Sequence, residues 1–138
     1  MNVHISDDYR PSEDEPFMNS RQQEYFRMKL LRWRTEILED ASQTIVNLQE
    51  ETVKEPDIAD RASTESERAL ELRTRDRQRK LIGKIDAALR RLDEGEYGYC
   101  DETGDPISLK RLEARPVATL TLEAQERHER REKVYRDD

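Results

Sequence analysis

Two aspartates three positions apart, Asp57 and Asp60, are the residues whose type and spacing point most directly to chemistry. Because side chains three positions apart project from the same side of a helix, both carboxylates can point in one direction. Two such carboxylates can hold a divalent cation or accept hydrogen bonds from a partner. The alternative is structural, because an aspartate at the start of a helix caps it and meets the positive end of its dipole. We expect this structural use more for Asp60 than for Asp57, and one residue can serve both.

Residues typical of an active site do not accompany these aspartates. Cys100, His4 and His128 lie far apart in the sequence, and no glycine-rich phosphate loop or histidine-rich metal motif is present. We therefore expect a protein that is not an enzyme.

A group of basic residues follows further along the chain. Arginine occupies every second position from 73 to 79, which spreads the charges around a helix, so a solvated surface is the default interpretation. Together with Lys84, Arg111 and Arg115 this group can also build an anion site, because guanidinium groups bind phosphate through two hydrogen bonds. The residues alone leave both interpretations open.

Two long helical segments must position the aspartates. Apolar residues recur every three or four positions over 26–48 and again over 62–92, where Leu72 is one of the apolar stripe, and this predicts two amphipathic helices. Pro56 disfavours a helix at the residue before it, so the first helix is expected to end there. Each helix alone would gain little stability, because packing of the apolar face supplies most of it. We therefore predict a long antiparallel coiled-coil hairpin over residues 20–94, with its tip at about 52–62.

The composition favours elongated helices over a thick globular core. Of the 138 residues, 41% are charged and only 33% are hydrophobic. The net charge of −7 argues against a protein that binds the phosphate backbone of nucleic acids. A single cysteine excludes an internal disulfide and fits a reducing compartment. No apolar run approaches the roughly 20 residues of a membrane span. We expect a cytoplasmic monomer without membrane association and without direct sequence-specific binding of nucleic acid.

The two ends of the chain differ from the hairpin. Residues 1–19 are acidic, and we interpret them as an extension that packs on or near the head, although the composition leaves disorder equally open. Ser20 with Gln23 forms a capping-box pattern at the start of the hairpin. Residues 95–138 hold glycine-containing turns, a short helix over 108–114 that Ser108 can cap, and a final polar helix. We interpret them as a small globular head with a C-terminal helix, which completes an all-α fold.

Three stretches of the sequence resemble one known protein family. They are ELRTRDRQRKLI at 71–82, EYGYC at 96–100 and RLEARP at 111–116. They are similar to the DksA branch of the DksA/TraR family of bacterial transcription factors that bind RNA polymerase. The resemblance runs from about residue 20 to the C-terminal helix. It implies a hairpin that enters the secondary channel of the polymerase and, with the alarmone guanosine tetraphosphate (ppGpp), modulates the stability of open complexes at stringent-response promoters.

The resemblance also assigns roles to the tip and to some of the basic residues. The family's two tip aspartates and a following alanine fall on Asp57, Asp60 and Ala62, which are then expected to act at the active-site region of the polymerase. A further lysine of the family's alarmone site is replaced by Gln125, so we expect weaker or differently arranged ppGpp binding. The other residues of that site fall on Leu81, Lys84, Arg111 and Arg115.

The resemblance departs at the zinc site of the family. Typical members hold one structural zinc ion with four cysteines, whereas the corresponding positions here are Cys100, Thr103, Thr121 and Ala124. Because one thiolate cannot complete a tetrahedral site, we predict a variant that lacks zinc and is indifferent to thiol oxidation. The apolar residues predicted to hold the head instead are Ile107, Leu109, Leu112, Val117 and Leu120.

Two alternative functions stay open. In the first, the tip carboxylates bring a magnesium ion to the polymerase active site, as in a Gre-like factor that stimulates transcript cleavage. In the second, the chain is a coiled-coil adaptor unrelated to polymerase. The three resembling stretches favour the initiation factor over both.

Overall fold

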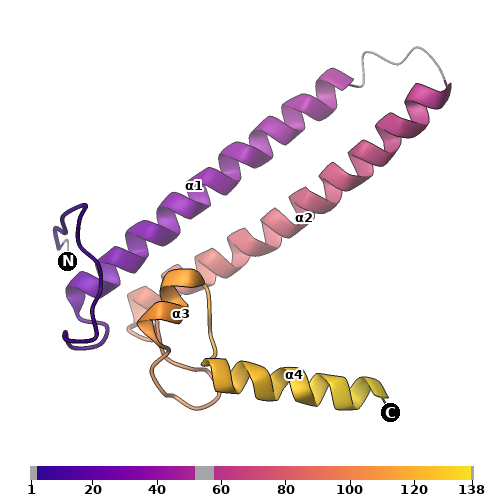
Figure 1. The fold of residues 1–138 in the computed structure, drawn as a ribbon. Helices are drawn as coiled ribbons and strands as arrows, with labels where there is room; N and C mark the ends of the chain where they lie inside the picture. Colours follow the sequence, from indigo (N-terminus) through magenta and orange to yellow (C-terminus); the bar gives the residue numbers. More distant parts are fainter. Residues whose placement is uncertain (1–2, 52–57, 138) are drawn as a thin grey trace. The chain divides into compact units, whose positions relative to one another are not determined.

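The structure is a computed structural model that describes residues 3–51 and 58–137 (Figure 1). The described residues form four helices, which are α1 (Ser20–Glu51), α2 (Ile58–Glu94), α3 (Leu109–Ala114) and α4 (Leu122–Asp137). They form no strand, and Tyr99 and Pro106 make only an isolated antiparallel bridge. The predicted all-α fold class is therefore confirmed.

The chain divides into two compact units that are described separately. The hairpin unit comprises Leu31–Asp86, and the head unit comprises Met1–Leu30 together with Ala87–Asp138. Helices α1 and α2 each contribute residues to both units. None of the described helices is long and apolar enough to span a membrane.

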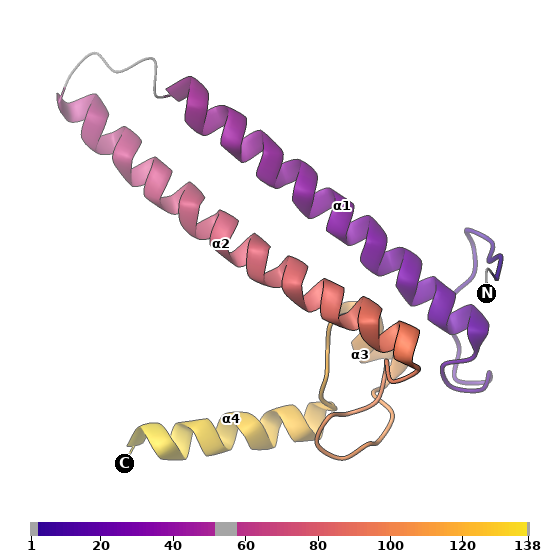
Figure 2. The same cartoon turned by 180° about the vertical axis from the view of Figure 1, so that it is seen from behind.

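In the hairpin unit, α1 and α2 run antiparallel and side by side, as both views show (Figures 1 and 2). Ile37 of α1 and Ile85 of α2 are buried. Nearby, Nε of Arg34 donates a 2.8 Å hydrogen bond to the carboxylate of Asp86. This end of the unit therefore has the apolar centre and the flanking ion pair that are typical of a helical hairpin.

Further along α2, polar residues occupy the positions that an apolar seam would use. Glu71 and Gln78 precede Ile85 at seven-residue spacing, the repeat of a coiled-coil seam. Glu71 Oε2 and Gln78 Oε1 are buried without a hydrogen-bond partner among the described residues. Leu72, which we had placed on the apolar stripe, is 51% exposed. Because it follows Glu71 directly, it is rotated by about 100° away from the seam, and the prediction for Leu72 was wrong.

The head unit has its own apolar core. Ile107, Leu112 and Val117 are buried as predicted, whereas Leu109 and Leu120 are half-buried. The other buried apolar side chains of this unit are Tyr9, Met18, Phe26, Leu30, Ala88, Leu92, Tyr97, Cys100, Ala118 and Ala124. The core thus joins the N-terminal segment, the ends of both long helices and the C-terminal region.

Local capping residues set the helix boundaries of the head unit. Ser108 caps α3 as predicted, because its Oγ accepts a 3.2 Å hydrogen bond from the N–H of Arg111. Gly95 follows the last residue of α2 with a φ of 76°, a left-handed conformation that glycine adopts without strain. At the start of α1, however, the cap is Asn19, whose Oδ1 accepts a 2.9 Å hydrogen bond from the N–H of Gln22. The predicted capping role of Ser20 was therefore wrong.

The N-terminal segment packs against the first turns of α1. The ring of Tyr9 contacts Tyr25 edge to face, with centroids 6.0 Å apart, and the guanidinium of Arg21 lies 4.3 Å from the centroid of the Tyr9 ring. The hydroxyl of Tyr9 donates to the carboxylate of Glu15. Burial and this carboxylate raise the pKa of Tyr9 from 10.0 to about 12. An ordered network therefore attaches the extension to the head unit from residue 9 onwards.

Candidate functional site

Two of the three predicted tip residues, Asp60 and Ala62, lie in the first turns of α2. Asp57 falls outside the described residues. Asp60 is the third residue of α2, and its side chain is likewise outside the described part. Ala62 is exposed on the same helix. Helix α2 begins at Ile58, inside the stretch that we predicted as the tip, so Asp60 has a helical backbone.

Two of the four predicted alarmone residues lie in the hairpin unit. Leu81 and Lys84 are three positions apart on α2, and side chains at this spacing share one side of a helix. Leu81 is half-buried and Lys84 is exposed. The ammonium group of Lys84 has no ion-pair partner among the described residues, so it is available to an external anion.

The other two predicted alarmone residues lie in the head unit, at the two ends of one turn. Arg111 is in α3, and its Nε donates a 2.8 Å hydrogen bond to the carbonyl of Leu120. Arg115 is the C-cap of α3, and its N–H donates to the carbonyl of Arg111 at 2.7 Å. The side chain of Arg115 is exposed. Arg111 thus has a structural hydrogen bond, whereas the guanidinium of Arg115 faces solvent. That all four residues form one site stays a prediction.

Gln125 occupies the position of the family's further lysine, in the first turns of α4. Its Nε2 donates a 3.1 Å hydrogen bond to the carboxylate of Glu129, one turn later. An amide carries no charge, so this position offers an anion a weaker contact than an ammonium group would.

The four positions that correspond to the family's zinc ligands are linked by hydrogen bonds that start at the sulfur of Cys100. The Oγ1 of Thr121 lies 3.9 Å from the Sγ of Cys100 and donates to it. The same oxygen accepts a 3.2 Å hydrogen bond from the N–H of Ala124, whose side chain is fully buried. Thr103 also hydrogen-bonds to the sulfur of Cys100. The fold therefore brings these positions together with one cysteine, two hydroxyls and one methyl group.

The environment of Cys100 favours the thiolate. Burial alone would raise the pKa of this thiol. Hydrogen bonds from the Thr103 hydroxyl and from the N–H groups of Thr121, Thr103 and Glu102 outweigh burial and lower the pKa from 9.0 to about 7.

This donor set does not fit a zinc ion held by four thiolates. Zinc in structural sites takes cysteine sulfur, histidine nitrogen or carboxylate oxygen, and only Cys100 among the four positions supplies such a donor. Within residues 3–51 and 58–137, no three His, Cys, Asp or Glu side chains are grouped so that they could hold a metal.

Sequence reasoning missed the polar contact that holds α3 on α1. Nζ of Lys29 lies 2.8 Å from both the carbonyl oxygen and Oε1 of Glu113, and the hydroxyl of Tyr25 donates to the same carboxylate. Burial alone would raise the pKa of Glu113, but the hydrogen bonds from Lys29 and Tyr25 lower it below its ordinary value of 4.5. The contact fixes α3 and hence Arg111. Partners more than 80 residues apart leave no local signal in the sequence.

Comparison with known families corrects the prediction about zinc. Residues 95–130 match the family described as the prokaryotic dksA/traR C4-type zinc finger. This match points to zinc binding and contradicts our prediction of a head without a zinc cofactor. The head is a segment of a zinc-finger family, although its four ligand positions hold one cysteine.

The remaining comparisons cover almost the whole chain. Residues 22–92 match the family described as the DnaK suppressor protein DksA, N-terminal domain. The RNA polymerase-binding transcription factor DksA of Caulobacter vibrioides is 70% identical over 131 residues, which are 95% of this chain and 92% of the relative. The protein of the same name from Escherichia coli is 41% identical over 91% of this chain and 83% of its own length.

A solved structure agrees with these relatives. The structure of transcription factor DksA2 from Pseudomonas aeruginosa is 46% identical, with a TM-score of 0.78, and the match covers 85% of this chain and 90% of that one. Sequence, family and fold thus agree over both units. This chain belongs to the DksA family.

Proposed function

We propose that this protein binds bacterial RNA polymerase and regulates the initiation of transcription. The observation that carries the proposal is the 70% identity over 131 residues to a relative named for that activity. At such identity over nearly the full length of both chains, the surfaces that recognise a partner are expected to be shared. The protein acts as a regulator and has no catalytic activity of its own.

The proposed role of the hairpin is to carry Asp57 and Asp60 into the secondary channel of the polymerase. The length of the helices supports this role, because the 37 residues of α2 at about 1.5 Å per residue extend over roughly 55 Å. In this proposal the two carboxylates act at the polymerase active-site region and change the stability of open complexes. Ala62 follows them on an exposed part of α2.

We propose that ppGpp is a co-effector bound at the polymerase interface by Leu81, Lys84, Arg111 and Arg115. Two observations support this assignment. Lys84 and Arg115 are exposed, and neither has an ion-pair partner among the described residues. Cationic groups in this state bind phosphate without first breaking another ion pair. The Gln125–Glu129 hydrogen bond replaces a potential cationic contact, so we expect the dependence on ppGpp to be weaker than in members with lysine there.

The proposed place of action is the cytoplasm, where the polymerase works. One chain acts on one polymerase, and promoter DNA is recognised by the polymerase and not by this protein.

The test is the lifetime of open complexes at a ribosomal promoter, measured with purified polymerase, with and without ppGpp. The wild-type chain is expected to shorten the lifetime, and more so with ppGpp. The double variant Asp57→Asn, Asp60→Asn is expected to bind polymerase in a pull-down but to leave the lifetime unchanged. A matched control is Glu65→Gln with Glu67→Gln, which removes the same charge from exposed positions of α2 and should behave as the wild type.

Two results would count against the proposal. Full activity of the double aspartate variant would remove the assignment of the tip. Failure of the wild-type chain to bind polymerase would remove the function itself. Stimulated transcript cleavage in backtracked complexes, with no effect on open complexes, would instead support a cleavage factor.

A further inference from the structure

One side of the hairpin unit carries exposed apolar side chains at coiled-coil spacing. Leu31, Leu38 and Ile45 of α1 are 46%, 46% and 37% exposed. They are seven residues apart, so they lie in one row along the helix, with a drift of only about 20° per repeat. A single exposed leucine is ordinary, but a row of three at this spacing has the pattern of a helix-packing seam.

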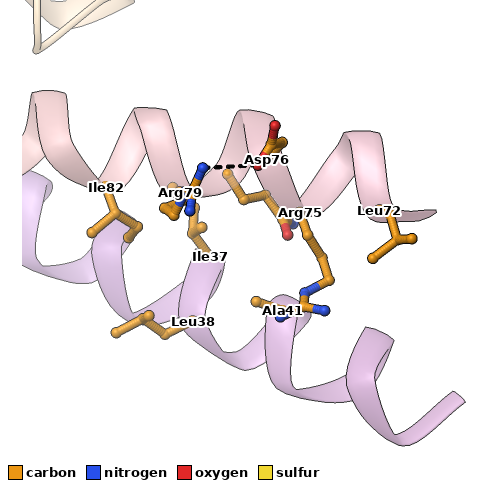
Figure 3. Close-up of a pocket in the computed structure, with 9 residues that line it drawn as sticks. Ile37, Leu38, Ala41, Leu72, Arg75, Asp76, Arg79 and Ile82 are labelled. Atoms are coloured by element: carbon orange, nitrogen blue, oxygen red, sulfur yellow. Dashed lines mark hydrogen bonds and ion pairs between the residues drawn. The ribbon is translucent and has the colours of Figure 1, made fainter. Parts of the chain in front are cut away.

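Beside this row lies a groove between the two helices of the unit. It has a volume of about 380 Å³. Figure 3 shows its apolar wall, formed from both helices, with the charged residues of α2 between Ile82 and Leu72. The apolar residues that line it are Ile37, Leu38 and Ala41 of α1 and Leu72 and Ile82 of α2. Leu38 belongs to both the row and the groove, so the two form one continuous surface.

The charged residues of the groove are mainly basic. Arg75 extends from α2 towards α1 on the side of Ala41 (Figure 3), and it has no hydrogen bond or ion pair among the described residues. Arg79 donates a 3.0 Å hydrogen bond to Asp76. The three charged lining residues therefore leave one guanidinium group uncompensated over an apolar surface.

We infer that this surface, the side groove, binds an amphipathic helix with acidic residues along one edge. A helix laid along the row places its apolar residues against Leu38, Leu72 and their neighbours, in the way that amphipathic helices occupy hydrophobic grooves. Its flanking carboxylate then meets the unpaired guanidinium of Arg75 in a bidentate ion pair. The length from Leu31 to Ile45 corresponds to about four turns of such a helix.

The side groove is separate from the sites considered above. Lys84 lies nine residues after Arg75, which is two and a half turns, so it projects from the opposite face of α2. The groove also lies many residues along α2 from Asp60. The inference therefore does not depend on the proposed function, and polymerase binding is measured independently of it.

The net charge of the whole protein opposes the expected preference for an acidic helix. With a net charge of −7, the chain as a whole attracts a basic peptide and repels an acidic one. Preference for an acidic helix can then arise only from local basic residues, of which Arg75 lines the groove without an ion pair among the described residues.

The experiment uses two fluorescent, hydrocarbon-stapled helices of about four turns that share the same row of leucines. One has glutamate along the flanks of the row and the other has lysine. Each is titrated with the full chain, and binding is followed by fluorescence anisotropy. The glutamate helix is expected to bind saturably, and the lysine helix about tenfold more weakly or not at all.

Three variants localise the binding. Leu38→Glu places a charge on the apolar row and is expected to abolish binding of the glutamate helix. Arg75→Glu is expected to weaken it by about tenfold, the effect of replacing an attractive pair with a repulsive one. Arg77→Glu makes the same change of charge at an exposed position about 200° around α2 from Arg75, and it should leave affinity unchanged. Circular dichroism checks that each variant retains its helices.

Several results would overturn the inference. They are an absence of saturable binding, tighter binding of the lysine helix, and equal losses in the Arg75→Glu and Arg77→Glu variants. Sedimentation of the chain alone provides a further test. Self-association that Leu38→Glu abolishes would show that a second copy occupies the side groove, and it would reject the acidic helix as its partner.

Discussion

Replacing Gln22 with leucine is expected to detach the N-terminal segment from the head unit. Gln22 is fully buried. Its Oε1 accepts a 2.8 Å hydrogen bond from the N–H of Met18, and its Nε2 donates a 3.2 Å hydrogen bond to the carbonyl of Ser12. Met18 has a φ of 53°, a left-handed conformation that costs roughly 1 kcal/mol in a residue with a side chain. The side chain of Gln22 therefore holds a strained turn in place.

The size of the effect follows from the groups left without a partner. Leucine has nearly the size of glutamine and a high helix propensity, so it neither opens a large cavity nor weakens α1. It leaves the N–H of Met18 and the carbonyl of Ser12 without partners, at a cost of about 1–3 kcal/mol for each buried group. Burial of the leucine side chain offsets part of this cost. We expect a net loss of about 3 kcal/mol in the docking of residues 3–18, a factor on the order of 100 in the opening equilibrium.

The assay is amide hydrogen exchange, followed by NMR at the N–H of Met18. Exchange at this site reports the local opening of the segment rather than global unfolding. It is expected to be about 100-fold faster in Gln22→Leu than in the wild type. The free energy of unfolding, measured by urea denaturation with circular dichroism, should fall by no more than the docking free energy of the segment.

A graded control comes from the neighbouring glutamine. The side chain of Gln23 makes one hydrogen bond among the described residues, from its Nε2 to the carbonyl of Met18 at 2.7 Å, and Gln23 is only half-buried. Gln23→Leu should therefore accelerate exchange by about tenfold or less. If exchange at Met18 changes by less than about twofold in Gln22→Leu, or if both variants behave alike, the reasoning is refuted.

Two further predictions concern the head unit. The buried hydroxyl of Tyr97 donates to the carbonyl of Pro116 at 2.8 Å, and burial raises the pKa of Tyr97. Tyr97→Phe should therefore lower the free energy of unfolding by about 1–2 kcal/mol, measured by urea denaturation. An unchanged urea midpoint would contradict this. The lowered pKa of Glu113 means that its contacts with Lys29 and Tyr25 stabilise the fold above the ordinary pKa of 4.5 and are lost as the pH falls through the folded pKa. Because the pair is partly exposed, Glu113→Gln should lower the free energy of unfolding by only about 1 kcal/mol at neutral pH. The variant should also lose less stability than the wild type as the pH falls below 4.5. The same loss of stability in both proteins below pH 4.5 would argue against this role of Glu113.

The sequence predicts those parts of the structure that depend on local chemistry. Regular apolar spacing identified the two long helices, because the period of a helix is visible in a single segment. Ser108 was recognised as the cap of α3 for the same reason, since its partner is three residues away. At the start of α1 two candidate caps stand side by side. The choice of Asn19 over Ser20 depends on the path of the preceding chain, which no local pattern specifies.

The seam and the polar contacts of the head depend on residues that are distant in the sequence. A rule that places apolar residues in the seam assigns Leu72 to it, yet Glu71 and Gln78 hold the seam positions. The Lys29–Glu113 contact likewise joins two helices, and its partners are 84 positions apart in the sequence. Only the packed structure identifies such pairs. The error about zinc was of another kind. The resemblance already covered this segment, but we predicted a head without zinc because only one of the four ligand positions is a cysteine, and the match of residues 95–130 to the zinc-finger family contradicts that prediction.

The structure also decides which residues can test alarmone binding cleanly. The Nε of Arg111 already bonds the carbonyl of Leu120, two residues before α4 begins. Its removal would leave that half-buried carbonyl without a partner and disturb the approach to α4, so loss of ppGpp response in an Arg111 variant would have two explanations. Lys84 and Arg115 are exposed and have no ion pair among the described residues to break. A change in ppGpp response after Lys84→Ala or Arg115→Ala therefore reports binding rather than folding, and these two positions carry the discriminating experiment.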